Sequence, residues 1–327
     1  MHHQLAIVIP AYKNTFLRET LSSIANQSDK RFMLYIGDDC SPNDVKSIVD
    51  EFKDKINLIY HRFDKNLGGT DLVGHWQRCI ELTHDEPYIW LFSDDDIMDR
   101  RCVEYFNQLP NYIKEDSLCH FDIKLIDSQN NDRLVDLPKF PYKLTAGEFL
   151  EAKLRGRLYS FVVEFIFSRN LYHRIGGFKN FDLAWGADFM TWITMISECK
   201  NGLITISKSD GLVKWRKSNE NISPNHSHDI SIRKIKSLIE NAMFLKQLMC
   251  TSPQSFRPLK KCFRWLRFPL GEIHRKRNIL TIKEIYALCG LYKKKVGYPF
   301  QCVFFFVYQC LNSGMLKLLR SAIRRAK

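Results

Sequence analysis

The chain has 327 residues, of which 45% are hydrophobic, and this length suits one large domain or one domain with an appendage. The formal charge of +13 lies in the C-terminal part, because residues 255–327 carry 17 Lys or Arg against two acids and residues 1–254 have a net charge of −2. The absence of a CxxC pair and of an apolar window of about 18 residues argues against a zinc site and a membrane-spanning helix.

The first hundred residues alternate short apolar runs with segments of helical periodicity. Alternation of this kind predicts βαβ units and a doubly wound, mostly parallel α/β sheet flanked by helices. We expect strands at residues 5–9, 32–37, 56–60 and 88–92, and helices at about 16–24 (with Thr15 as N-cap), 43–52 and 70–82.

Polar residues follow the predicted strands, at the edge where such sheets bind ligands. Tyr12 comes after the first strand, Asp38 and Asp39 after the second, and the triplet 94–96 after the fourth. The chain lacks a glycine-rich phosphate loop, so a divalent cation, Mg²⁺ or Mn²⁺, is the expected partner of a diphosphate here. The alternative is that the acids precede a helix and interact with its dipole.

Six stretches, in order, resemble the motifs of family-2 glycosyltransferases, which have the glycosyltransferase-A fold. The resemblance covers about two thirds of the chain, from Leu5 to Ser223. It implies an enzyme that moves a sugar from a nucleotide-sugar donor, expected to be UDP-linked, to an acceptor hydroxyl. The stretches are IVIPAYKN (7–14), IGDDCSPND (36–44), NLGGT (66–70), LFSDDDI (91–97), IGGFKNFDLAWGADFMTW (175–192) and KWRKSNENIS (214–223).

The resemblance assigns the donor side of the site to the first four stretches. The triplet can be aligned with the family's DxD segment in two ways. One alignment makes Asp95 the metal ligand with Asp94 facing the ribose, and the other pairs Asp94 with Asp96. We take Asp95 as the ligand and keep Asp96 as a candidate. The remaining nucleotide-binding candidates are Pro10, Ala11, Tyr12, Asp39 (with Asp38 as the alternative), Asn66 and Gly68.

The resemblance assigns the acceptor side to the last two stretches. Asp188 matches the catalytic base, and Arg216 becomes the phosphate candidate because Ser218 stands where the family often has a histidine. A single base and no covalent intermediate imply inversion at the anomeric carbon. By pattern alone, Asp188 could instead be an N-terminal helix acid that interacts with the helix dipole.

The basic C-terminal region mixes cations with bulky apolar residues. In residues 255–278, Phe256 and Leu270 belong to an apolar set at helical spacing beside Lys260 and Arg264. We expect contact with an anionic membrane surface, with simple packing on the catalytic body or nucleic-acid binding as alternatives. No nucleic acid is expected, because no binding motif accompanies the charge.

These observations predict a catalytic domain at residues 1–225, with a nucleotide half (1–110) and an acceptor half (111–225), and a helical region at 226–327. The chain shows no signal peptide, so a cytoplasmic protein on the inner membrane face is expected. By analogy, the acceptor is a glycan on a polyprenyl lipid carrier in bacterial surface-polysaccharide synthesis, O-antigen or capsule. The rival functions are a retaining glycosyltransferase, a nucleotidyltransferase, and a non-catalytic protein with a nucleic-acid-binding tail.

Overall fold

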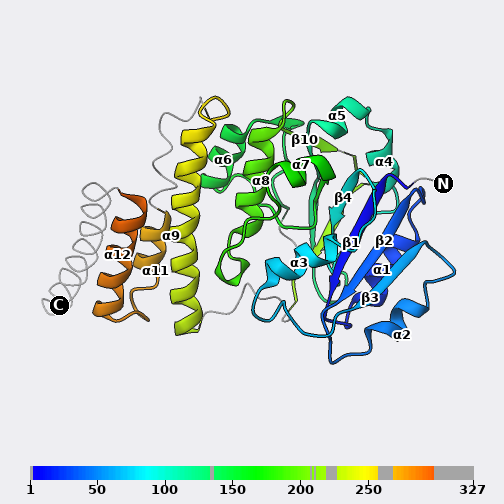
Figure 1. Cartoon of the computed structure of the whole chain (residues 1–327), viewed down its shortest axis with the longest axis horizontal. Coiled ribbons are helices and arrows are strands. Elements are labelled where there is room, and N and C mark those ends of the chain that lie inside the picture. The colour runs from blue at the N-terminus through cyan, green and yellow to red at the C-terminus, as the bar shows by residue number, and fades with distance from the viewer. Residues whose placement is uncertain are drawn as a thin grey trace, which may run out of the picture. The chain divides into compact units, whose positions relative to one another are not determined.

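A computed structural model describes residues 3–132, 136–206, 208–209, 211–218, 227–256 and 268–297 (Figure 1). The chain divides into two units. The larger unit comprises Met1–Asn180, Ala187–Pro224 and Ser252–Leu259, and the smaller unit comprises Phe181–Gly186, Asn225–Thr251 and Lys260–Lys327.

The larger unit is built on a sheet of strong β-formers. Among the described residues it has eight strands in the order β3-β2-β1-β4-β9-β6-β10-β8. The strands β1, β2, β3 and β4 are mutually parallel, β9 runs antiparallel between β4 and β6, and β10 pairs with β6 in parallel. The mostly parallel sheet and its four leading strands are therefore confirmed. The bounds are β1 Leu5–Ala11, β2 Phe32–Asp38, β3 Leu58–Arg62, β4 Tyr88–Leu91, β6 Leu118–Phe121, β8 Lys143–Leu144, β9 Phe165–Ser168 and β10 Leu203–Ile206.

Helices cover both faces of this sheet. Apolar side chains of α1, α2 and α4 share one core with Ile7, Ile36 and Trp90. Helix α3 lies on the other face. Successive residues of a strand face opposite sides of the sheet, so a Cβ on Gly37 would lie on the face opposite to Ile36, and it would stand 2.4 Å from Cys79 Sγ of α3. The helices are α1 Leu17–Ala25, α2 Val45–Asp50, α3 Leu72–Ile80, α4 Cys102–Gln108, α5 Asn111–Glu115, α6 Ala146–Leu154, α7 Arg169–Arg174 and α8 Ala187–Glu198.

The start of α1 differs from the prediction. The N-cap position is held by Phe16, which has no side-chain cap hydrogen bond, and Thr15 lies one residue earlier. The expected apolar face of α1 is nevertheless buried, including Leu17, Leu21 and Ile24. Packing on the sheet rather than side-chain capping thus stabilises this helix.

A second, small sheet lies next to the aspartate triplet. Strand β11 (Val213–Arg216) pairs antiparallel with β5 (Ile97–Met98) and parallel with β7 (Ile123–Ile126). This pairing joins the segment that follows the triplet to a strand more than a hundred residues later in the chain.

The described part of the smaller unit is helical. It contains the short 3₁₀ segment η1 (Asp182–Ala184) and helices α9 (His228–Thr251), α11 (Phe268–Arg275) and α12 (Ile282–Val296). Ile239, Leu270 and Tyr292 are in its core, and α12 ends at Gly297 with φ 74°. None of the described helices has the length and apolarity needed to cross a membrane.

Candidate functional site

Asp94 is fixed by the turn that follows β1. Its Oδ2 accepts hydrogen bonds from the backbone N–H groups of Tyr12 (2.9 Å) and Lys13 (2.8 Å). Only 5% of Asp94 is exposed, and burial raises the pKa of its carboxyl while the Lys13 ammonium opposes this shift. Charge-assisted bonds of this kind contribute about 1.5–3 kcal/mol each. The end of β1 and the end of β4 are thus joined through one carboxylate.

Lys13 lies between two carboxylates of the triplet. Its ammonium contacts Asp95 Oδ2 and is 3.4 Å from Asp94 Oδ1. Burial lowers the pKa of Lys13, but Asp94 and Asp95 outweigh it and raise the pKa above its ordinary value. The two acids therefore already face one positive charge.

Asp96 and Arg216 hold the backbone of the turn. Asp96 accepts from the Arg216 backbone N–H (2.7 Å, Oδ1) and from the Ser93 hydroxyl (2.6 Å, Oδ2), and it is 1% exposed. Burial, and then the Asp95 charge, raise the pKa of Asp96 to about 8. Both of its oxygens are engaged by protein donors, so the geometry favours Asp95 over Asp96 as a metal ligand.

The Arg216 guanidinium points into the protein rather than toward a ligand. Its Nε donates to the Asp95 carbonyl (2.7 Å), and its other nitrogens donate to the Asp127 carbonyl (3.2 Å) and to Glu19 (2.8 Å). The side chain is fully buried, and its guanidinium carbon lies 4.2 Å from the Phe16 ring centroid. This arrangement argues against the expected phosphate role, because protein acceptors take all three guanidinium nitrogens.

Asp39 organises the loop that follows β3. It accepts hydrogen bonds from the backbone N–H groups of Leu67 (2.8 Å) and Gly68 (2.8 Å) and from the Asn66 amide (2.9 Å). Arg78 also donates to it. A Cβ on Gly68 would lie 2.7 Å from Asp39 Oδ2, so the loop requires glycine there. The structure thus brings Asp39, Asn66 and Gly68 together.

The same loop is connected to the aspartate triplet through β1. Pro10 and Ala11 are the last residues of β1, and the Asp39 backbone N–H donates to the Ala11 carbonyl (2.9 Å). The Tyr12 side chain is 42% exposed, as an aromatic ring that covers a base would be. Asp38, the alternative to Asp39 as a nucleotide-binding residue, is fully buried and accepts hydrogen bonds from Tyr60 (2.6 Å) and Arg62 (2.7 Å).

Asp188 lies in the first turn of α8, beside a buried cluster of charge. Burial raises the pKa of Asp188, and the positive charge of Lys153 opposes this shift. Glu164 is fully buried just before β9, with its Oε1 3.6 Å from His120 Nε2. Burial lowers the pKa of His120 to about 3 and raises that of Glu164 well above the ordinary value. Several ionisable groups therefore meet on the acceptor side.

A hollow of about 490 Å³ opens beyond the end of β6. Its lining includes His120, Asp122 and Phe140, together with Tyr159, which is half exposed. Its volume is within the range of about 300–1,000 Å³ for small-molecule sites. Carboxylate, imidazole and aromatic groups in one hollow suit the binding of a sugar.

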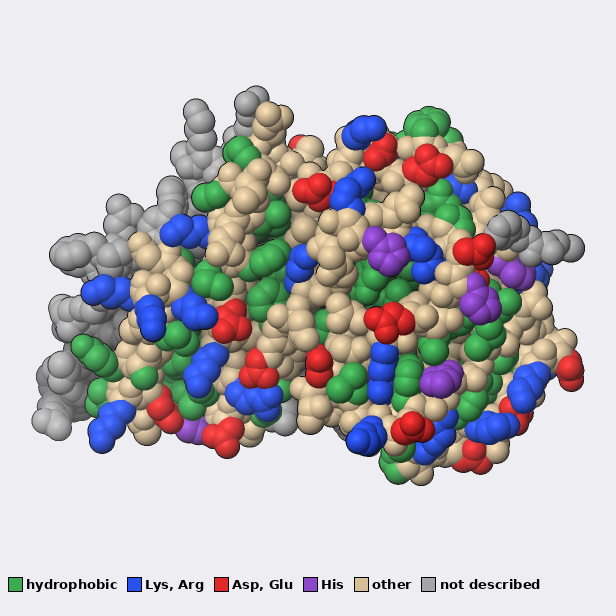
Figure 2. Space-filling view, viewed as in Figure 1, with side chains coloured by type: hydrophobic (Ala, Val, Ile, Leu, Met, Phe, Trp, Pro, Cys, Tyr) green, Lys and Arg blue, Asp and Glu red, His purple; other side chains and the backbone are tan. Residues whose placement is uncertain are grey.

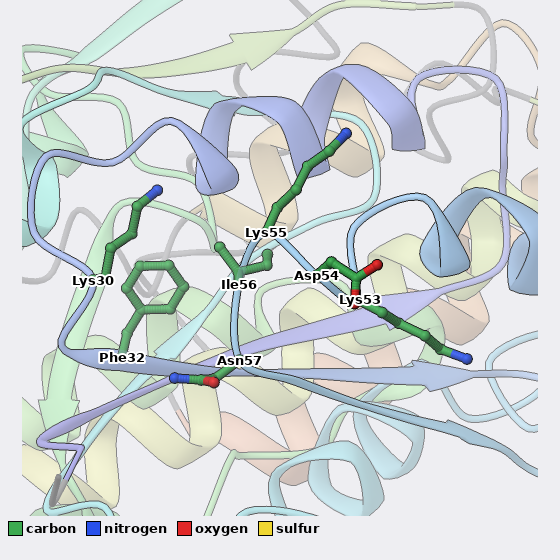
Figure 3. A pocket seen from close by; sticks show the side chains of 7 residues that line it. All are labelled: Lys30, Phe32, Lys53, Asp54, Lys55, Ile56 and Asn57. Carbon is green, nitrogen blue, oxygen red and sulfur yellow. The ribbon is translucent and has the colours of Figure 1, made fainter.

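A different pocket, of about 190 Å³, lies at the start of β2 and just before β3 (Figure 3). Its lining includes Lys30, Phe32, Lys53 and Lys55. Strands β1–β4 are parallel, so this pocket is at the opposite edge of the sheet from Asp39 and Asp94. It therefore has no part in the candidate site.

The acidic turn suits a divalent cation of the Mg²⁺ or Mn²⁺ type. Within the described ranges, no three His, Cys, Asp or Glu side chains are grouped to enclose a metal ion. Magnesium sites often use only one or two carboxylates, with substrate phosphates and water as the other ligands. Asp95 and the Oδ1 of Asp94 provide such a pair, and the Lys13 ammonium already bridges them.

Part of the chain is similar to a known family of enzymes. Residues 6–137 match "Glycosyl transferase family 2". This stretch of the chain is therefore similar to family-2 glycosyltransferases. A curated relative, poly(ribitol-phosphate) beta-N-acetylglucosaminyltransferase TarS of Staphylococcus aureus strain Mu50, is 29% identical over 149 residues. That match covers 44% of this chain and only 24% of TarS.

Solved structures show that the chain has the glycosyltransferase-A fold. S. aureus TarS 1–349 in complex with UDP-GlcNAc aligns with a TM-score of 0.55 at 14% identity, over 90% of this chain and 89% of that one. Mannosyltransferase PcManGT from Pyrobaculum calidifontis, in complex with GDP-Man and Mn²⁺, aligns with a TM-score of 0.52 at 12% identity, over 94% and 86%. The predicted fold class and family resemblance are confirmed.

The sequence analysis missed several charged groups of the candidate site. Lys13 lies in the motif IVIPAYKN, but the sequence assigns it no function. Glu164 lies in the apolar run FVVEFIF and is not among the predicted site residues. A lone acid in such a run signals a buried carboxylate, because an exposed strand would alternate with other polar residues. The position of Lys153 could not be read from the sequence.

Proposed function

We propose that the chain transfers a sugar from a nucleotide-sugar donor, UDP-linked, to a glycan hydroxyl, with inversion and with Mg²⁺ or Mn²⁺ as cofactor. The observation that carries this proposal is the set of residues at the carboxyl edge of the sheet. Tyr12 and Lys13 fix Asp94, Asp95 lies beside it, and Asp39 orders the loop next to β1. The nucleotide sugars bound by TarS and PcManGT support a donor of this class.

The donor side has two parts. Pro10, Ala11 and Tyr12 form the wall for the base, and Asp39 acts by shaping the loop that contains Asn66 and Gly68. Asp94 would face the ribose, and Asp95 would hold the cation. When bound, the cation neutralises the negative charge that develops on the departing diphosphate.

The acceptor side supplies the base. Asp188 takes the proton of the acceptor hydroxyl as its oxygen bonds to the anomeric carbon, and the electrons of the breaking bond leave with the diphosphate. The nearby Lys153 favours the ionised form that a base needs. The hollow beside Asp122 and Tyr159 holds the acceptor sugar.

The acceptor is a glycan on a polyprenyl carrier, and the protein works at an anionic membrane surface. The last turn of α12 contains Lys293, Lys294 and Lys295. On the same helix, Ile282 and Tyr286 are 86% and 82% exposed. Figure 2 shows Lys and Arg side chains beside hydrophobic ones over the C-terminal helices. Cations beside exposed apolar groups suit a lipid interface. Residues 257–267 of the basic segment, which include Lys260 and Arg264, and all of 298–327 lie outside the described residues.

A donor screen tests the proposal. The purified chain should hydrolyse one of a set of UDP- and GDP-sugars only with Mg²⁺ or Mn²⁺, and the product's anomeric configuration separates inversion from retention. Release of diphosphate with formation of a new nucleotide bond would indicate a nucleotidyltransferase. Steeply salt-dependent DNA or RNA binding without hydrolysis would favour the non-catalytic rival.

A further inference from the structure

Lys13 faces two carboxylates that the donor reaction uses for other purposes. Its ammonium contacts Asp95 Oδ2 and approaches Asp94 Oδ1 to 3.4 Å, while its backbone N–H donates to Asp94 Oδ2 at 2.8 Å. The Lys13 side chain keeps 28% of its surface exposed, whereas those of Asp94 and Asp95 keep 6% and 10%. The lysine is thus the solvent-facing member of the group.

A cation at Asp95 and the Lys13 ammonium compete for the same oxygens. Two neighbouring buried carboxylates repel each other unless a positive charge is close to both. Lys13 supplies that charge when no metal is bound. A flexible four-carbon stem allows its ammonium to move a few ångströms while the backbone N–H still holds Asp94.

We propose that Lys13 is the resident counter-cation of this site: it leaves Asp95 when a divalent cation binds there and then pairs with the donor's diphosphate. This inference rests on the proposed function, since it requires a metal and a diphosphate at the acidic turn. Lysine commonly binds phosphate as a point charge, and the Lys13 side chain is partly exposed, so a ligand in solvent can reach its ammonium.

Manganese and UDP titrations of Lys13→Met and Lys13→Arg test the inference. The readout for Mn²⁺ alone is the loss of the free-ion paramagnetic resonance signal, and UDP binding is measured by calorimetry at saturating Mn²⁺. Removal of the competing charge should strengthen binding of Mn²⁺ alone by about 5- to 10-fold in Lys13→Met. UDP affinity should fall by about 10-fold in the same variant, because a phosphate contact is lost. Lys13→Arg keeps the charge and should keep Mn²⁺ affinity within about twofold of wild type.

Two controls separate a loss of folding from a loss of binding. Lys13→Met should melt at a lower temperature than wild type in EDTA and gain more from added Mn²⁺, since the metal replaces the lost counter-charge. Lys46→Met removes an exposed lysine whose partner is Asp50 at 2.7 Å on α2, and should change neither titration.

Equal Mn²⁺ affinity in wild type and Lys13→Met would overturn the competition, and unchanged UDP affinity would overturn the diphosphate contact. A wild-type chain that binds neither Mn²⁺ nor UDP contradicts the proposed function itself. A wild type that binds both, matched by Lys13→Met, removes only the role of Lys13.

Discussion

Replacing Arg216 with methionine separates a structural role from a phosphate-binding one. Methionine keeps much of the length and apolar stem but removes every guanidinium donor. The Asp95 and Asp127 carbonyls lose their bonds of 2.7 and 3.2 Å, and Glu19 loses its partner at 2.8 Å. The arginine is fully buried, so water does not replace these bonds without rearrangement.

The expected loss of stability is large. Each orphaned buried acceptor costs about 1–3 kcal/mol, and removing one partner of a buried ionic contact costs about 3–5 kcal/mol. Glu19 is partly exposed and returns to water, so the two orphaned carbonyls dominate the loss, and together they cost about 2–6 kcal/mol. The backbone N–H of residue 216 still donates to Asp96, which limits the damage.

Urea unfolding of the metal-free protein, followed by tryptophan fluorescence, measures this effect. Arg18→Met is the matched control. Arg18 is next to Glu19 on α1, but its guanidinium pairs with Glu51 at the surface, so this substitution should cost less than about 1 kcal/mol of stability. A stability loss below about 1 kcal/mol in Arg216→Met, together with a large loss of UDP affinity, would refute the structural assignment and restore the phosphate role.

The remaining predictions concern the base and the nucleotide loop. Asp188→Asn should lower kcat by about 10²–10⁴-fold with UDP binding unchanged, and normal turnover would remove Asp188 as the base. Burial raises the pKa of Asp188 and Lys153 opposes it, so Lys153→Met should move the acidic limb of the kcat–pH profile to higher pH; an unmoved limb would contradict this coupling. Gly68→Ala should weaken UDP binding by about 10-fold, because its Cβ would stand 2.7 Å from Asp39 Oδ2. Gly290→Ala, with open space around its Cβ in a helix, is the control and should be neutral or stabilising by up to about 1 kcal/mol.

The fold was predictable because local pattern and global packing agree in the first hundred residues. Ile7, Leu34 and Trp90 belong to apolar runs bounded by polar turns, and each run became a buried strand. The order of β9 and β6 was not predictable, because an antiparallel strand inserted after a long excursion leaves no periodic signal. The small sheet of β5, β7 and β11 was missed for the same reason.

The site was predictable by residue type more than by orientation. A motif states that acids follow β4, but tertiary contacts decide which of them faces a ligand. Ser93 and the Arg216 backbone engage Asp96, and Lys13 reaches Asp95. The predicted boundary near residue 225 and the roles of the individual site residues stay predictions.

Titration of UDP in the presence and absence of Mn²⁺, with wild type and Asp95→Ala, tests the central claim most directly. The exposed Asp64→Ala is the control. We expect wild type and the control to bind UDP tightly only with Mn²⁺, and Asp95→Ala to lose about 100-fold in affinity, or about 2.8 kcal/mol. Binding of UDP that is independent of Mn²⁺ and equal in all three proteins would contradict the assignment of a metal-bridged diphosphate to this acidic turn.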